Sequence, residues 1–327
     1  MAASGLLPSK AWCALAVAPG VWVTCQAGKE ELRGEPREEG AGMARSKDWL
    51  RPGEHVIVTG GSSGIGLALA EEFAARGAVV SLLARGEARL ASAAEALRAA
   101  GATVHTRSVD VTDSAGLSAA IDALEAEAGP CAVLVTSAGQ ARPGKFLELP
   151  DDVFRTMMDV DYFGTLWAVR AVAPRMVSRG RGTVVTIASA AGLIGVYGYT
   201  AYGAAKFAVR GLTEALRGEL APHGVRVACV FPPDVDTPQL AEESQWKPAE
   251  TAAIAGIVKP LQPRVAARGI LRRLDRGQPV ICLDGFSRAL ARWGGVLAPV
   301  LRRYMDGRVR AAQRKEAGTA TRSPAVD

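Results

Sequence analysis

A glycine-rich stretch near residue 60 constrains the fold of this chain more than any other feature. The apolar run at residues 55–58 (HVIV) predicts a buried strand, and residues 59–66 (TGGSSGIG) break it sharply. Residues 67–76 then carry apolar side chains at helical spacing and end at Gly77, which suits a helix C-cap. Glycine lets the backbone approach a pyrophosphate, and a helix N-terminus offers free N–H groups. We therefore assign dinucleotide contacts to Gly60, Ser62, Ser63, Gly64, Ile65 and Gly66.

Strands and helices alternate along the rest of the chain. Further strands are predicted at residues 79–83, 104–109, 131–136, 183–188, 225–230 and 279–283, and helices at 87–100, 114–128, 151–179 and 200–221. Strands that are apolar throughout and separated by helices indicate a parallel sheet covered on both faces. The chain is thus predicted to be an α/β protein with a doubly wound, seven-stranded Rossmann sheet. Its single domain spans residues 51–285, with terminal extensions and a site at the carboxyl ends of the strands.

Composition narrows the possible function classes. The net charge of +6 is diffuse, and no interleaving of basic and aromatic residues indicates nucleic-acid binding. Five cysteines without a C-x-x-C pair favour a reduced, cytoplasmic compartment, and three isolated histidines predict no metal site.

The N-terminal 50 residues do not look like part of the domain. Residues 11–23 are moderately apolar but shorter than the ~20 residues of a bilayer span, and residues 30–42 are charged and glycine-rich. The segment could be a targeting signal, an unstructured leader, or a spurious extension ahead of a start at Met43. Residues 308–327 are predicted to be disordered.

The residues after the second strand indicate which dinucleotide binds. NAD-specific folds usually place an acid there, whereas the 2′-phosphate of NADP needs a cation. This chain has Arg85, with Arg89 one helical turn later, so we predict NADP(H). Asp110, next to Val111, could accept a hydrogen bond from the adenine amino group or serve only as a helix N-cap. The alternative is that the two arginines are solvated surface residues.

Three residues are candidates for the chemistry. Ser189 follows the fifth strand, while Tyr202 and Lys206 stand four residues apart and share one face of a helix. A phenol with a pKa near 10 is a poor acid or base at neutral pH, and a nearby ammonium lowers that pKa. The tyrosine could then exchange a proton with a carbonyl or alcohol, while the serine holds the same oxygen.

With these motifs, 59–66 and 202–206 (YGAAK), the sequence resembles the short-chain dehydrogenase/reductase family over residues 50–285. Within it, residues 137–146, 201–212 and 231–238 (FPPDVDTP), with 241–243 and 247–248, resemble the 3-ketodihydrosphingosine reductases. The resemblance implies further cofactor contacts from Val111, Ala138, Gly139, Tyr202, Lys206, Pro232, Val235 and Thr237, the last to the nicotinamide carboxamide. Two family asparagines are replaced, by Thr136 and by Asp161. Asp161 stands at the fourth catalytic position, so its effect on the proton relay is open.

The resemblance implies NADPH-dependent reduction of a ketone to a secondary alcohol, with 3-ketodihydrosphingosine or another long-chain lipid ketone as substrate. A steroid, ketoacyl or xenobiotic ketone is an alternative, as is a non-catalytic dinucleotide-sensing scaffold. We also expect a homo-oligomer. Residues 286–307 predict an amphipathic helix, interrupted by arginines, that cannot span a bilayer. It could lie on an anionic membrane surface, pack on the domain, or form a dimer interface.

Overall fold

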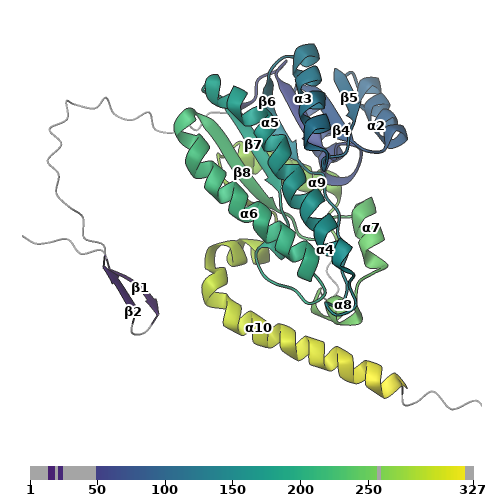
Figure 1. The fold of residues 1–327 in the computed structure, drawn as a ribbon, viewed down its shortest axis with the longest axis vertical. Helices are drawn as coiled ribbons and strands as arrows, with labels where there is room; N and C mark the ends of the chain where they lie inside the picture. The colour runs from purple at the N-terminus through teal and green to yellow at the C-terminus, as the bar shows by residue number, and fades with distance from the viewer. Residues whose placement is uncertain (1–13, 19–20, 25–48, 256–258, 321–327) are drawn as a thin grey trace, which may run out of the picture. The chain divides into compact units, whose positions relative to one another are not determined.

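The computed structural model in Figure 1 describes residues 14–18, 21–24, 49–255 and 259–320. Residues 1–44 and 45–327 form two compact units, each described here by itself. The described part of the first unit is an antiparallel hairpin of β1 (Ala14–Ala18) and β2 (Val21–Thr24). The rest of the predicted leader, and residues 321–327 of the predicted tail, lie outside the described residues.

The second unit is built on a seven-stranded sheet with the order β5-β4-β3-β6-β7-β8-β9, in which every pairing of neighbours is parallel. The strands are β3 (His55–Thr59), β4 (Val79–Ala84), β5 (Val104–Ser108), β6 (Cys131–Thr136), β7 (Gly182–Ile187), β8 (Val225–Phe231) and β9 (Val280–Cys282). This confirms the predicted doubly wound α/β fold.

Helices cover both faces of the sheet (Figure 1). The α-helices are α1 (Gly64–Ala74), α2 (Glu87–Ala99), α3 (Ser114–Ala128), α4 (Asp151–Met157), α5 (Gly164–Ser178), α6 (Thr200–Leu220), α7 (Pro238–Ser244), α8 (Ala249–Ala255), α9 (Pro263–Leu274) and α10 (Gly285–Ala320). Two short 3-10 turns are η3 (Ala190–Gly192) and η4 (Ala221–His223).

The core lies in two layers because side chains alternate between the faces of a strand. On β3, Val56 and Val58 pack with Phe73 of α1 on one face, whereas Ile57 packs with Ile121 of α3 on the other. All five residues are fully buried. This double burial explains why β3 reads as a continuous apolar run rather than an alternating one.

The folded domain begins before the predicted boundary at residue 51. Trp49 is buried, with its ring edge-to-face against Phe73 at 6.0 Å between centroids. Its indole N–H donates to Asp275 Oδ1 at 2.9 Å. The sequence offered no periodicity at this isolated tryptophan, which lies just before the predicted boundary.

Two helical predictions also differ from the structure. The helix predicted at 151–179 is divided by a π-helical segment, η2 (Met158–Phe163), which carries Asp161. The C-terminal helix predicted at 286–307 runs from Gly285 to Ala320, so residues 308–320 are helical rather than disordered.

The sheet order reverses between β3 and β6, and ligands of such sheets bind outside the carboxyl ends of the strands at this switch point. The loops that follow β3, β4, β6, β7 and β8 therefore converge on one edge. Among the described helices, none is long and apolar enough to cross a membrane.

Candidate active site

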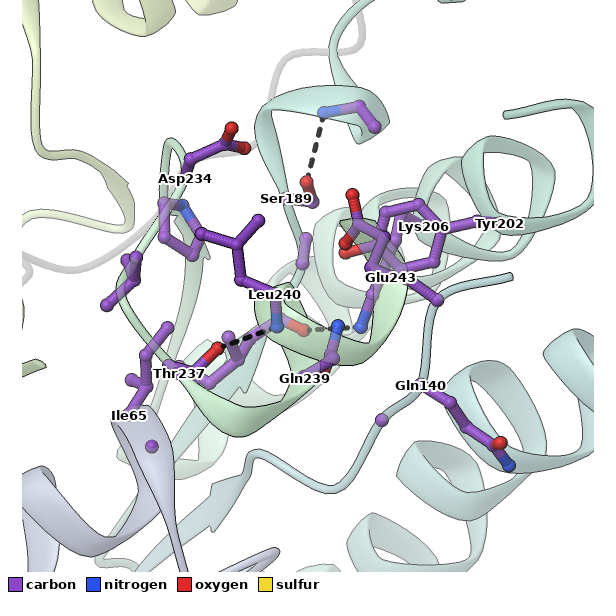
Figure 2. A pocket seen from close by; sticks show the side chains of 18 of the residues that line it. Ile65, Gln140, Ser189, Tyr202, Lys206, Asp234, Thr237, Gln239, Leu240 and Glu243 are labelled. Atoms are coloured by element: carbon purple, nitrogen blue, oxygen red, sulfur yellow. Dashed lines mark hydrogen bonds between the residues drawn. The ribbon is translucent and has the colours of Figure 1, made fainter. Parts of the chain in front are cut away.

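A cavity of about 1010 Å³ opens at this edge of the sheet (Figure 2). Almost all of the predicted site residues line it: Gly60, Ser62, Ser63, Gly64, Ile65, Arg85, Arg89, Asp110, Val111, Ala138, Gly139, Ser189, Tyr202, Lys206, Pro232, Val235 and Thr237. Gly66 and Asp161 lie behind this lining. The structure thus brings together residues that the sequence separates by up to 177 positions.

The glycine turn after β3 is shaped to admit a pyrophosphate. Gly60 has a φ of +68°, and a Cβ there would lie 2.6 Å from Ala138 N, so the turn needs glycine on both counts. Gly66 packs beneath it, where a Cβ would lie 2.4 Å from Gly60 O. Ser63 caps α1 without a side-chain hydrogen bond, which leaves the first N–H groups of the helix available to a ligand. These residues fit a dinucleotide phosphate.

The adenosine end of the cavity carries the predicted cations. Arg85 follows β4 directly, and its backbone carbonyl accepts a hydrogen bond from Ser108 Oγ at 3.0 Å. Its guanidinium lies 3.6 Å from Asp110 Oδ2 and is largely exposed. Partial burial opposes ionisation of Asp110, but hydrogen bonds from Thr112 and the charge of Arg85 outweigh it, so its pKa is lowered. Arg85 is therefore held at the cavity by a carboxylate, with its exposed face free to meet an anion.

Ser189, Tyr202 and Lys206 gather on one side of the cavity, with Ile65 and Thr237 across from them (Figure 2). Ser189 follows β7 and caps the turn η3, where its Oγ accepts a hydrogen bond from Ala191 N at 3.1 Å. Tyr202 and Lys206 lie one turn apart near the start of α6, and both are buried. The Lys206 ammonium lies 5.6 Å from the centre of the Tyr202 ring.

The pKa of Tyr202 differs from the simple sequence argument. Burial raises it to about 12, which outweighs the lowering by the charge of Lys206 and by the hydrogen bond from Ser189. The charge of Asp161 raises it further. The sequence correctly indicated the direction of the Lys206 effect, but the net shift is upward because burial is greater. A phenol with this pKa stays protonated at neutral pH, but it is a weaker acid than a free phenol, so proton donation depends on stabilisation of the resulting phenolate by Lys206.

Asp161 stands directly behind the lysine. It is fully buried, and its Oδ1 lies 3.1 Å from Lys206 Nζ and accepts a hydrogen bond from Gln140 N at 3.2 Å. A Cβ at Gly139 would lie 2.6 Å from the same oxygen, so glycine is required there. Burial lowers the Lys206 pKa, but the charges of Asp161 and Tyr202 outweigh it and the net pKa is raised. Lys206, which also donates to Ile187 O at 3.2 Å, is thus kept cationic.

The other replaced asparagine has a different environment. Thr136 ends β6 and is buried, and its hydroxyl has no hydrogen-bond partner among the described residues. The neighbouring turn is instead held by Ala138 N, which donates to Thr59 Oγ1 at 3.3 Å. Thr237 caps α7 through a hydrogen bond from Leu240 N at 3.2 Å, and its methyl group packs over Gly64. Thr136 itself lies outside the cavity lining.

Sequence reasoning missed a second buried cluster beside Tyr202. The hydroxyl of Tyr199 donates to Glu243 of α7, and Lys247 Nζ lies 2.9 Å from the same carboxylate. The rings of Tyr199 and Tyr202 lie 5.7 Å apart. The match at 241–243 and 247–248 pointed to this segment, but nothing local indicated that it would contact a residue 44 positions earlier. The cluster fixes α7 over the catalytic side chains.

These features define a class of protein. Residues 54–248 match the short chain dehydrogenase family, and the chain belongs to the short-chain dehydrogenase/reductase family of oxidoreductases. Among its relatives, a 3-ketodihydrosphingosine reductase from Bos taurus is 40% identical over 231 residues, covering 69% of this chain and 70% of the relative. A 3-dehydrosphinganine reductase from Danio rerio is 40% identical over 230 residues, 69% of each chain.

Solved structures agree with this assignment. A short-chain dehydrogenase from Sphingobium yanoikuyae in complex with NADPH is 27% identical, with a TM-score of 0.66, and covers 84% of this chain and 97% of its own. An actinorhodin polyketide ketoreductase with NADPH is 30% identical, with a TM-score of 0.66, and covers 72% of this chain and 98% of its own. A dehydrogenase from Mycobacterium paratuberculosis with a TM-score of 0.66 is bound instead to NAD.

Proposed function

We propose that this protein reduces the ketone of 3-ketodihydrosphingosine, or of a closely related long-chain lipid, with NADPH. One observation carries the proposal: Ser189, Tyr202 and Lys206 line the same cavity as the glycine turn that fits a dinucleotide phosphate. Two relatives at 40% identity are reductases of this substrate class by name, which supports the choice of ketone.

The proposed mechanism follows from the side chains. A nicotinamide dinucleotide held by the glycine turn and Arg85 would supply the hydride that the carbonyl carbon receives. Tyr202 donates its phenolic proton to the carbonyl oxygen, to which Ser189 donates a hydrogen bond as negative charge develops. The ammonium of Lys206 stabilises the phenolate that remains, and Asp161 holds that ammonium at 3.1 Å. Hydride on carbon and proton on oxygen together give the secondary alcohol.

The choice of NADPH rests on the residues after β4. The strand ends at Ala84 and is followed by Arg85 rather than by an acid that would bind a ribose hydroxyl. Arg85 and Arg89 both line the cavity, where a bidentate guanidinium can hold a 2′-phosphate. We expect Arg85→Ala to weaken NADPH binding about tenfold or more and to leave NADH binding unchanged. If Arg85→Ala kept the preference for NADPH over NADH, Arg85 would not be the residue that holds the 2′-phosphate. The control is Arg276→Ala, at an exposed arginine outside the cavity lining.

The size and lining of the cavity support a long-chain substrate. Beyond the catalytic side chains, apolar residues of α7, α8 and α10 contribute to its wall: Leu240, Ile254, Leu290, Leu301 and Met305. A cavity of about 1010 Å³ lies at the upper end of the ordinary range for small-molecule sites. Because Gly60, Arg85 and Arg89 line the same cavity, its volume has to hold the whole dinucleotide as well as part of an alkyl chain.

The test is NADPH consumption by purified protein with 3-ketodihydrosphingosine and with a panel of steroid, ketoacyl and short-chain ketones, with product identified by mass spectrometry. We expect the sphingoid ketone to be preferred. Tyr202→Phe should lower turnover at least about 10²-fold, because it removes the proton donor, whereas Tyr162→Phe should not. Turnover of other ketones alone would overturn the sphingoid substrate. Cofactor binding without any turnover would instead indicate a dinucleotide sensor.

A further inference from the structure

The C-terminal helix α10 has an exposed apolar face that the proposed reaction does not use. Trp293, Val296, Val300 and Tyr304 recur at three- and four-residue intervals and so share one side of the helix. Their side chains are 55%, 75%, 69% and 57% exposed. We name these four residues the apolar stripe. A row of large exposed apolar side chains on one face indicates a contact surface.

The helix is fixed to the domain by the side that neighbours the apolar stripe. Leu290 is buried in a cluster that includes Phe231 at the end of β8, and Leu301 packs against the same cluster. Farther along, Arg308 Nε donates to Ala253 O of α8 at 2.9 Å. Figure 1 shows α10 running along one end of the domain beside α8. These contacts lie on the side of α10 next to the apolar stripe, so the stripe stays exposed on a helix that is docked to the domain.

The helix α10 is strongly basic. Residues 285–320 contain eight basic and two acidic side chains, a net charge of +6 that equals the net charge of the whole chain. Arg292, Arg303 and Arg310 fall at helical intervals that place them together beside the apolar stripe, and all three are exposed. An apolar stripe bordered by arginines complements an anionic lipid surface, where the apolar side chains enter the headgroup boundary and the cations meet phosphate.

The apolar stripe also adjoins the catalytic cavity. Tyr304 belongs to the stripe and also lines the cavity. Phe286, at the start of the helix, is 60% exposed and lines the cavity as well. Leu301 and Met305, on the neighbouring side of α10, complete this part of the lining. A continuous apolar path thus leads from the exposed face of α10 into the cavity.

We propose that α10 seats the protein on an anionic lipid surface through the apolar stripe and its bordering arginines, so that a lipid ketone passes from the membrane into the cavity. This proposal deepens the proposed function and rests on its lipid-like substrate. The attachment depends on an amphipathic helix and on charge, so it is weakened by salt.

Co-sedimentation with vesicles tests the proposal without requiring turnover. Vesicles of phosphatidylcholine alone are compared with vesicles of equal parts phosphatidylcholine and phosphatidylglycerol. We expect the full-length protein to bind the anionic vesicles and to be released by high salt. A triple variant, Trp293→Ser, Val296→Ser and Val300→Ser, should bind about tenfold more weakly or worse, because the apolar contact is lost. None of these three residues lines the cavity.

A second triple variant removes charge: Arg292→Gln, Arg303→Gln and Arg310→Gln should also weaken binding about tenfold or more. Its matched control removes three charges elsewhere, Arg217→Gln, Arg272→Gln and Arg276→Gln, all at exposed positions. Val265→Ser, at a 53% exposed valine of α9, is the control for the apolar variant. Both controls should bind vesicles as the unmodified protein does, and all four variants should reduce a short, water-soluble ketone at the unmodified rate.

The outcomes separate this proposal from the proposed function. The proposal that α10 binds a lipid surface would be overturned if the unmodified protein failed to bind anionic vesicles. It would also be overturned if the apolar variant bound them as strongly as the unmodified protein. A smaller assembly for the apolar variant in analytical ultracentrifugation, without any loss of vesicle binding, would show that the stripe joins two copies of the chain. Vesicle binding without reduction of any ketone would overturn only the proposed function.

Discussion

Replacement of Asp161 by asparagine isolates the charge behind the catalytic lysine. Asparagine retains an acceptor for Gln140 N and Lys206 Nζ, so the hydrogen bonds seen at 3.2 and 3.1 Å can persist while the charge disappears. Asp161 is one of the causes that raise the pKa of Tyr202 to about 12. Its removal should therefore lower that pKa, and Tyr202 should lose its proton at a lower pH.

The distances set the size of the effect. Asp161 Oδ1 lies 3.1 Å from Lys206 Nζ, which lies 5.6 Å from the centre of the Tyr202 ring, so the carboxylate is no farther than about 8.7 Å from that ring. At an effective dielectric of about 20, two unit charges at this distance interact by about 2 kcal/mol. This corresponds to about 1.4 pH units in the titration of Tyr202.

The assay is kcat/KM for ketone reduction as a function of pH. Reduction needs protonated Tyr202, so the unmodified protein should show no loss from this group up to about pH 10, well below its pKa of about 12. Asp161→Asn should begin to lose activity more than one pH unit earlier. Asp159→Asn, at an exposed acid of the same π-helical segment, should keep the original profile. A profile for Asp161→Asn that matches the unmodified protein would refute the electrostatic argument.

Three further predictions concern the rest of the domain. Gly66→Ala should abolish dinucleotide binding, measured by titration calorimetry, since its Cβ would lie 2.4 Å from Gly60 O; unchanged binding would show that the turn can relax. Burial lowers the pKa of His55 below 6.5, so the unfolded chain binds more protons than the folded one once the pH falls below that value; stability in urea should decrease there, and His55→Gln should remove that dependence. Phe73→Ala should cost about 3–5 kcal/mol of unfolding free energy, because the side chain is fully buried, and a loss below about 1 kcal/mol would contradict the packing described.

The sheet could be predicted from sequence because each of its strands leaves a local trace. β3 and β6 are buried on both faces, so their central residues appear as uninterrupted apolar runs, and in β8 the apolar run is broken only by Arg226 near its start. The glycine turn could also be predicted from the sequence. Both the positive φ of Gly60 and the close approach of Ala138 require a residue without a side chain, so glycine has to occur there. In such places the local sequence and the tertiary fold impose the same constraint.

Other features had no local trace. The helices α7 and α8 are only seven residues each, too short for a periodic pattern, and were not predicted. The contact between Tyr199 and Glu243 joins segments far apart in the chain. The net pKa of Tyr202 depends on how deeply the phenol is buried, which spacing along a helix cannot reveal. Each of these features depends on contacts between segments that are distant in the sequence.

The π-helical segment that carries Asp161 has a consequence for how this site can change. A π-turn holds one residue more than an α-turn, so the helical faces before and after η2 are offset by about 100° relative to uninterrupted α-winding. A chain shortened by one residue within Met158–Phe163 would regain that winding and rotate α4 relative to α5. The acid would then point away from Lys206 although every catalytic side chain was still present. The number of residues in this segment, and not only the identity of its side chains, therefore determines whether Asp161 reaches Lys206.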